Sequence, residues 1–141
     1  MKKEDHEKKE YILYITEGDH GFIENLIKEE EFFKKLSTVK IFMLAVALGF
    51  YYGTPLELTG KKKDYTRAEY LSDDYLALLY AVASCKGGID VITDKTMVFK
   101  IAQEYARGGL AYLRNIRDQI PFGHLTKHIE RIFYQIREKI V

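Results

Sequence analysis

A run of twelve residues, Ile41–Tyr52, contains only apolar, aromatic and glycine residues. A surface helix of a globular protein shows a single apolar stripe, so a helix that is apolar all round must be covered on nearly every side. The run is too short to cross a bilayer, which requires about 20 apolar residues. We therefore predict that Thr38–Gly53 is a buried central helix, capped at its start by Ser37 or Thr38.

The length and the charge balance of the chain limit what it can be. A chain of 141 residues predicts one domain. Its 22 Lys and Arg residues nearly match its 21 Asp and Glu residues, which argues against strong attraction of the whole surface to nucleic acid or to a membrane. The single cysteine, Cys85, excludes an internal disulfide framework, and we expect it to be a small buried core residue.

Hydrophobic periodicity predicts further helices joined by short connections. They are expected at about 22–36 with Asp19 as N-cap, after the capping box that begins at Thr66, from Ser72 to Gly87-Gly88, at about Lys95–Gln119 with Thr93 or Asp94 as N-cap, and at about Gly123–Ile140. This pattern predicts an all-α, compact, single-domain bundle of five to six helices around the buried central helix. The domain is expected to span residues 11–141, after a disordered tail at residues 1–10.

The segment Tyr11–Thr16, with the sequence YILYIT, fits either a short strand or the start of a helix. Its length does not separate the two possibilities. Because the chain shows no second convincing strand, we favour a docking segment or a helical turn. Residues 56–65 are expected to form an exposed loop.

Small residues occur in both of the longest predicted helices. Two glycines, Gly108 and Gly109, interrupt Lys95–Gln119 and should cost about 2 kcal/mol by helix propensity. They imply either a kink or a close crossing with another helix. The natural partner for a crossing is the central helix, which carries Ala45, Ala47 and Gly49.

The C-terminal part of the chain carries an excess of positive charge. From Lys100 onward there are eight Lys or Arg residues and four Asp or Glu residues. Arginine suits bidentate contacts with phosphate, and the candidate nucleic-acid-binding residues are Arg107, Arg114, Arg117, Lys127 and Arg131. The simpler interpretation is a solvated helix face with internal pairs such as Arg114–Asp118.

Motifs for catalysis or cofactor binding are missing from the sequence. His124 and His128 lie four residues apart on one helix face and are the only candidate metal pair, but a zinc site needs at least one more ligand. The segment Gly53–Lys61 does not have the spacing of a phosphate-binding loop. We therefore expect no cofactor, and we favour a protein without enzymatic activity.

The last predicted helix has a regular apolar stripe that could serve the core or a partner helix. Its members are Leu125, Ile129, Ile132, Phe133, Ile136 and Ile140. A homodimer formed through this stripe is therefore one expectation, and burial within the chain's own core is the other. The charged N-terminal segment is not followed by the apolar region of a secretory signal, so we expect a cytoplasmic protein.

Two segments, Lys40–Gly53 (KIFMLAVALGFYYG) and Ile101–Leu113 (IAQEYARGGLAYL), carry a family resemblance. They resemble the small proteins named dnd system-associated protein 4, which accompany DNA phosphorothioation operons in bacteria and archaea. The resemblance covers about residues 33–118 and supplies no catalytic residues. It implies a setting in DNA modification and defence.

Two functions remain open from the sequence. The first is a non-enzymatic helical accessory or adaptor protein of a DNA modification or restriction system, which would act through contacts with other protein subunits. The second is a nucleic-acid-binding module that uses the C-terminal arginines. A metal-dependent enzyme based on His124 and His128 is the least favoured reading.

Overall fold

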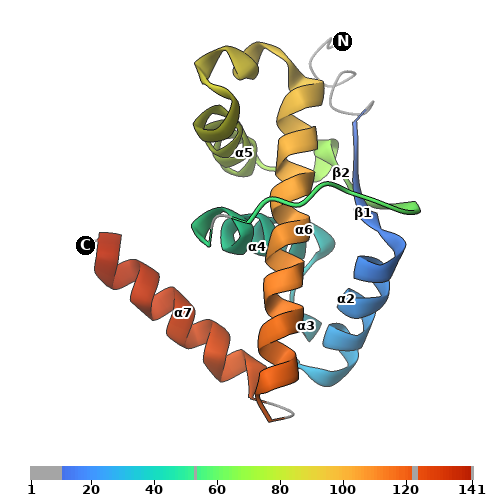
Figure 1. Ribbon diagram of the computed structural model, residues 1–141, viewed down its shortest axis with the longest axis vertical. Helices are drawn as coiled ribbons and strands as arrows, with labels where there is room; N and C mark the ends of the chain where they lie inside the picture. Colours follow the sequence, from blue (N-terminus) through green and yellow to red (C-terminus); the bar gives the residue numbers. More distant parts are fainter. Residues whose placement is uncertain (1–10, 53, 122–123, 141) are drawn as a thin grey trace.

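The computed structural model describes residues 11–52, 54–121 and 124–140, and the side chains within these ranges except those of residues 136, 139 and 140 (Figure 1). The elements in chain order are β1 (Ile12–Thr16), α2 (Glu17–Glu29), α3 (Glu31–Lys34), α4 (Thr38–Tyr51), β2 (Lys62–Arg67), the 3-10 turn η1 (Ala68–Tyr70), α5 (Asp73–Gly87), the 3-10 turn η2 (Ile89–Thr93), α6 (Lys95–Gln119) and α7 (Leu125–Ile140). The chain is thus mostly helical, as predicted, but the described part also contains a small sheet.

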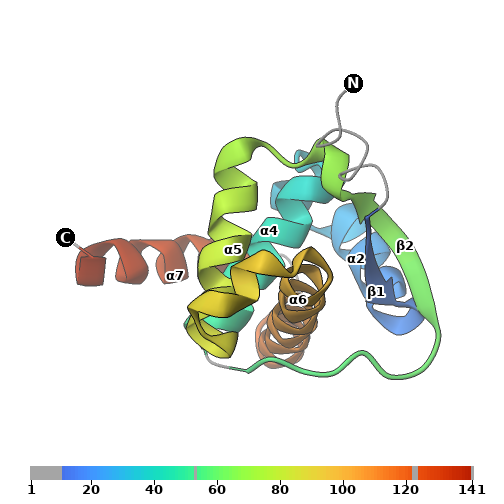
Figure 2. The same ribbon diagram turned by 90° about the horizontal axis from the view of Figure 1, so that it is seen from above.

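The long helix α6 forms the axis of the molecule, and the other elements pack along it (Figure 1). The central helix α4 crosses α6 near the middle. The sheet and α2 lie on one side of α6, while α5 and η2 lie on the other side at its N-terminal end (Figure 2). Helix α7 follows the C-terminal end of α6 and extends away from the rest of the molecule.

The sheet corrects the prediction for Tyr11–Thr16, which is neither a docking segment nor a helical turn. Strand β1 pairs antiparallel with β2, and the pairing is irregular between Leu13 and Tyr14. In β1, Leu13 and Ile15 face the core, whereas in β2 most side chains are exposed. The partner strand, KKDYTR, resembles a loop in sequence because a strand paired through its backbone with polar side chains outward shows no hydrophobic alternation.

Three of the helix caps predicted from the sequence are confirmed. The Ser37, Ser72 and Asp94 side chains each accept a hydrogen bond from a backbone N–H three residues later. Two signals were wrong. Helix α2 is capped by Thr16 rather than Asp19, and Thr66 lies in β2, where its buried hydroxyl accepts a hydrogen bond from Thr38 instead of starting a helix.

The crossing of α4 and α6 is a contact between backbones. A Cβ added at Gly49 would overlap the carbonyl group of Tyr105 and lie 3.0 Å from the backbone nitrogen of Gly109. A Cβ at Gly109 would in turn overlap the carbonyl of Ala45. These two close approaches confirm the predicted crossing, and α6 continues through its glycines as one helix.

The neighbouring positions complete this contact and correct one part of the prediction. Gly108 packs against the carbonyl of Thr54, in the segment that follows α4. That segment is held further along α6 by a hydrogen bond of 2.9 Å from the Leu56 N–H to the Glu104 carbonyl. Ala47, which the sequence places in the crossing, is exposed, since it lies on the opposite face of α4 from Ala45 and Gly49. The expected ending of the helix at Gly53 falls outside the described residues, as does the tail at residues 1–10.

The apolar stripe on α7 was predicted to serve either the core or a partner, and the first half of the stripe lies in the core. Leu125, Ile129 and Ile132 are buried, whereas Phe133 is 41% exposed. The prediction for Cys85 was wrong, because its side chain is exposed on α5. Within the described part of the chain, none of the helices has the length and apolar character needed to cross a membrane.

Replacing Gly49 with alanine should destabilise the fold by about 3 kcal/mol or more, because the added methyl group meets a carbonyl group of α6 that cannot rotate away. The matched control is Gly21→Ala in α2, where an added Cβ has no neighbour within 4 Å. It should leave stability unchanged or raise it by up to about 1 kcal/mol. Urea denaturation of the two variants measures the difference, and equal midpoints would contradict the crossing.

Candidate functional site

The three arginines of α6 that the sequence singled out all contact other parts of the same chain. Arg107 donates hydrogen bonds to the backbone carbonyl of Glu57 and, at 3.0 Å, to the hydroxyl of Thr59. These bonds attach the segment between α4 and β2 to α6. The guanidinium of Arg107 therefore has a structural task that its spacing on the helix did not reveal.

Arg114 binds the first turn of α2. Its guanidinium lies 3.3 Å from Oδ1 of Asp19 and 4.9 Å from the centre of the Phe22 ring. Asp19 is 5% exposed, and its Oδ2 has no hydrogen-bond partner among the described residues. Burial raises the pKa of Asp19 above its ordinary value, although Thr16 and Arg114 act in the opposite direction. Arg114 thus pairs with a buried carboxyl of α2 rather than with Asp118 of its own helix.

Arg117 binds the other end of α2. It forms an ion pair with Glu29 and lies 3.9 Å from Oε2 of Glu30, which is 2% exposed. Buried carboxylates are costly unless a cation or hydrogen-bond donors offset the loss of water. Together, Arg114 and Arg117 hold the two ends of α2 against the C-terminal half of α6.

These contacts divide the candidate nucleic-acid patch. The charges of Arg114 and Arg117 are offset by carboxylates, although both residues line an open groove of about 710 Å³ beside α2. Lys127 and Arg131 are exposed, but they belong to a different helix, α7. The sequence shows that the five candidate cations lie in the C-terminal part of the chain. It could not show that α2 packs against the side of α6 that carries Arg114 and Arg117.

The two histidines of the candidate metal pair have different surroundings. His124 is exposed, while Nε2 of His128 is buried without a hydrogen-bond partner in the described part of the chain. Burial, and to a smaller degree the charge of Arg131, lower the pKa of His128 below its ordinary value of 6.5. Among the described residues, no three His, Cys, Asp or Glu side chains lie close enough together to hold a metal ion.

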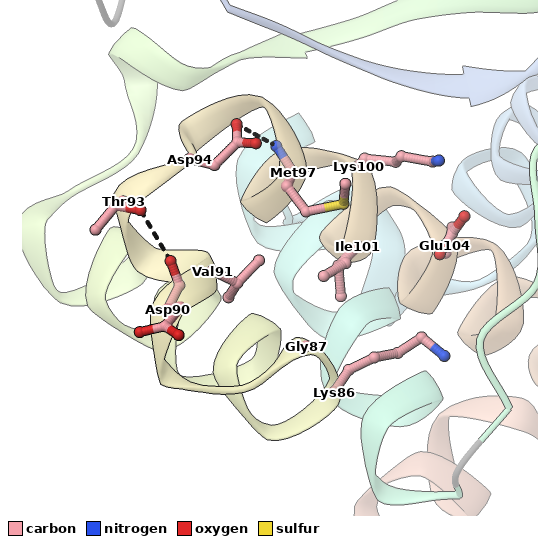
Figure 3. A pocket seen from close by; sticks show the side chains of 10 residues that line it. All are labelled: Lys86, Gly87, Asp90, Val91, Thr93, Asp94, Met97, Lys100, Ile101 and Glu104. Atoms are coloured by element: carbon pink, nitrogen blue, oxygen red, sulfur yellow. Dashed lines mark hydrogen bonds between the residues drawn. The ribbon is translucent and has the colours of Figure 1, made fainter.

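A second surface, which sequence reasoning missed, lies where α5, η2 and the start of α6 meet (Figure 3). The residues that line this open groove of about 650 Å³ are Lys86, Gly87, Asp90, Val91, Thr93, Asp94, Met97, Lys100, Ile101 and Glu104. We call it the η2 groove. Figure 3 shows Val91 and Ile101 in its middle, with Asp90 and Asp94 towards one end and Lys86 and Glu104 towards the other.

Three large apolar side chains are exposed on η2 and at the start of α6, and of these Met97 lines the η2 groove. Ile89 is 69% exposed, Ile92 is 43% exposed and Met97 is 39% exposed. No residue of η2, which is described along its whole length, is buried. In the sequence, Ile89–Ile92 is a short, largely apolar run between two predicted helices. A segment this apolar, and too short to form an amphipathic element, was the signal that could have identified an exposed contact surface.

Comparison with known proteins adds no assignment. The chain matches no protein-family model, no curated protein and no solved structure. The resemblance to the dnd system-associated protein 4 family therefore stays a prediction.

Replacing Arg117 with alanine should lower the free energy of unfolding by about 3 kcal/mol, because it removes the cation beside the buried carboxylate of Glu30. The control is Arg131→Ala, which removes the same charge from an exposed position and should change stability by less than about 0.5 kcal/mol. Thermal and urea unfolding measure both. Equal effects would show that Arg117 is not a structural residue.

The neutral form of His128 should make stability depend on pH. Because its pKa is lower in the folded chain than the ordinary value of 6.5, its contribution is complete above that value and is lost as the pH falls through the folded-state pKa. The free energy of unfolding should therefore decrease as the pH is lowered from about 7.5 to about 5.5. His128→Gln should reduce this decrease, and an unchanged pH profile would contradict the burial of His128.

Proposed function

We propose that this chain is a non-enzymatic helical adaptor that binds another protein through the η2 groove. The observation that carries the proposal is the exposure of Ile89, Ile92 and Met97, on η2 and at the start of α6, although the chain has a well-buried core elsewhere. Exposed apolar surface on a folded protein commonly marks a site of protein–protein contact. The groove is open to solvent rather than enclosed, which suits a polypeptide segment better than a small substrate.

The charges of the groove define the partner's chemistry. One end offers the carboxylates of Asp90 and Asp94, and the other end offers Lys86, Lys100 and Glu104. Apolar side chains lie between them. A complementary partner is an amphipathic segment with two or three apolar anchors, a Lys or Arg at the end that meets Asp90 and Asp94, and an acidic residue near Lys86.

The biological setting comes from the family resemblance alone. The segments Lys40–Gly53 and Ile101–Leu113 resemble the dnd system-associated protein 4 family, so we propose that the partner is a subunit of a DNA modification or restriction system in the cytoplasm. In this setting the chain would connect or regulate protein subunits, and the chemistry on DNA would belong to its partners.

Direct DNA binding through the arginines is the second proposal, and the contacts on α6 weaken it. Arg114 and Arg117 are paired with Asp19, Glu29 and Glu30, which leaves little net positive charge on that flank. Phosphate binding depends on cations that can replace the counterions of DNA. The exposed cations Lys127 and Arg131 on α7 are the ones that this proposal would need.

The adaptor proposal predicts selective loss of a native partner. Ile89→Asp and Ile92→Asp place a carboxylate on the exposed apolar surface of η2 and should remove the DNA-modification subunit that copurifies with the tagged chain from its native host. Tyr134→Asp is the matched control, since Tyr134 is 63% exposed on α7 and lies outside the groove. The same partner recovered with all three variants, or no DNA-modification component with the unmodified chain, would refute the proposal.

A salt series of duplex DNA binding separates the two functions. The adaptor proposal predicts weak binding at low salt that does not change when Lys127 and Arg131 are both replaced with alanine. The nucleic-acid proposal predicts a steep loss of affinity with added salt, and a slope that becomes shallower in the double variant. Neither residue is buried, so the variant should remain folded, as circular dichroism can verify.

A further inference from the structure

The two-stranded sheet has two outer edges, and in the described part of the chain only one of them is covered. On the outer side of β1, the Tyr14 N–H donates a hydrogen bond of 2.9 Å to the side-chain oxygen of Gln103 on α6. On the outer side of β2, Figure 2 shows no other described element. Strand β2 is therefore an edge strand whose outer side faces solvent.

The hydrogen bond from Tyr14 also shows which backbone groups of β2 point outward. Tyr14 pairs with Asp64. In an antiparallel pair, two opposite residues turn their N–H and C=O groups either toward each other or away from each other. Because the Tyr14 N–H points away from β2, those groups of Asp64 point away from β1, and so do those of Lys62, two residues earlier. The bond of 2.9 Å from the Glu17 N–H to the Lys61 carbonyl fits this alternation.

The outward groups form a template for one more strand. Residues two apart in a strand are separated by about 6.8 Å, so Lys62 and Asp64 offer two donors and two acceptors at the spacing of a sheet ladder. The side chains of Lys62, Lys63 and Asp64 are all exposed, so no described element covers either face of the strand here. An extended polypeptide can therefore pair with this edge through main-chain hydrogen bonds.

The charge along β2 selects the kind of polypeptide. Residues 61–67, KKKDYTR, carry four cations and one carboxylate. Lys61 lies 3.6 Å from a carboxylate oxygen of Glu17, whereas Lys62 and Lys63 have no ion-pair partner among the described residues. Opposite charges on neighbouring strands stabilise a sheet. A strand with acidic side chains opposite these two lysines is therefore complementary to the edge.

The same charges make a second copy of β2 a poor occupant. Paired parallel and in register, two copies bring each Lys62 and each Lys63 beside its own counterpart. Paired antiparallel about the middle of the strand, they bring Lys62 beside Arg67. Like charges directly opposite each other destabilise a sheet, and lysine on an edge strand protects a protein against self-pairing.

We propose that β2 binds an extended acidic segment of another protein, which adds a third strand to the sheet beside residues 62–64. The backbone of the segment pairs with the outward groups of Lys62 and Asp64, and two adjacent acidic side chains lie opposite Lys62 and Lys63, one on each face of the sheet. The surface lies on the other side of α6 from η2 (Figure 2), so the inference does not depend on the adaptor function of the η2 groove.

Fluorescence anisotropy with a labelled peptide tests the backbone pairing. The probe is the seven-residue peptide Thr-Val-Glu-Glu-Val-Thr-Val, and its matched control has the same sequence with N-methylated central residues, which keep both charges but donate no hydrogen bonds. The control should bind at least about fivefold more weakly. Equal binding of the two peptides, or no binding of the probe up to about 1 mM, would overturn the proposal.

A reversal of charge tests the selection of an acidic strand. The peptide Thr-Val-Lys-Lys-Val-Thr-Val should bind the unmodified chain at least about tenfold more weakly than the glutamate peptide. Lys62→Glu combined with Lys63→Glu should reverse this preference. A single-stranded DNA oligonucleotide of the same length that binds as tightly as the glutamate peptide would show a general attraction of anions to the lysines and would overturn the proposal.

A substitution at Asp64 tests the outward N–H directly. Asp64→Pro removes this donor but no bond of the ladder with β1, and edge strands accept proline at such a position. Asp64→Ala is the matched control, because it removes the same carboxylate and keeps the N–H. The proline variant should bind the glutamate peptide about fivefold more weakly than the alanine variant, and equal affinities would contradict strand addition.

Amide hydrogen exchange of the unmodified chain keeps the test decisive if the proline variant does not fold. The glutamate peptide should slow exchange at the N–H groups of Lys62 and Asp64, which point outward. The N–H of Lys63, which points toward β1, should change little and serves as the internal control. Unchanged exchange at both Lys62 and Asp64 under saturating peptide would overturn the proposal.

Discussion

The close contact between the backbones of α4 and α6 is the constraint on which the rest of the structure depends. Gly49 and Gly109 remove the side chains that would keep the two helices apart. With the helices this close, the apolar residues of α4 are covered by α6 without an intervening layer. The direction of α6 is then set, and α6 becomes the axis along which α2, α5 and the sheet are attached (Figure 1).

The charged residues of α6 act mainly within the chain. Arg114 and Arg117 bind both ends of α2 through Asp19, Glu29 and Glu30. A row of arginines on a helix is therefore not by itself a binding surface for phosphate. Such a row can bind phosphate only when no other element brings carboxylates to it, and in this protein α2 and its C-terminal end bring them. The surface that we assign to the adaptor's protein partner is instead the η2 groove, together with the exposed apolar residues of η2.

The exposed apolar surfaces follow from the way that α5 is attached. Leu79 and Ala83 are its fully buried residues, with Tyr75, Leu76, Tyr80 and Val82 partly buried against the core. The turn η2 then returns the chain to α6 without burying a residue of its own. This arrangement leaves Ile89, Ile92 and Met97 exposed to a partner's amphipathic segment.

The sequence alone determined the helices α4, α5, α6 and α7, the caps at Ser37, Ser72 and Asp94, and the crossing of the buried central helix with Gly109, whereas the single helix predicted at 22–36 is divided at Glu30 into α2 and α3. The helices and caps depend on the residues within one segment. The crossing depends on glycines in two helices, which only a close contact between them explains. Only the tertiary structure decided that Tyr11–Thr16 is a strand, because its partner is held by backbone hydrogen bonds that leave no hydrophobic pattern. It also decided the partners of the arginines and the exposure of Cys85 and Leu78, since the side of a helix that is covered depends on elements distant in the chain.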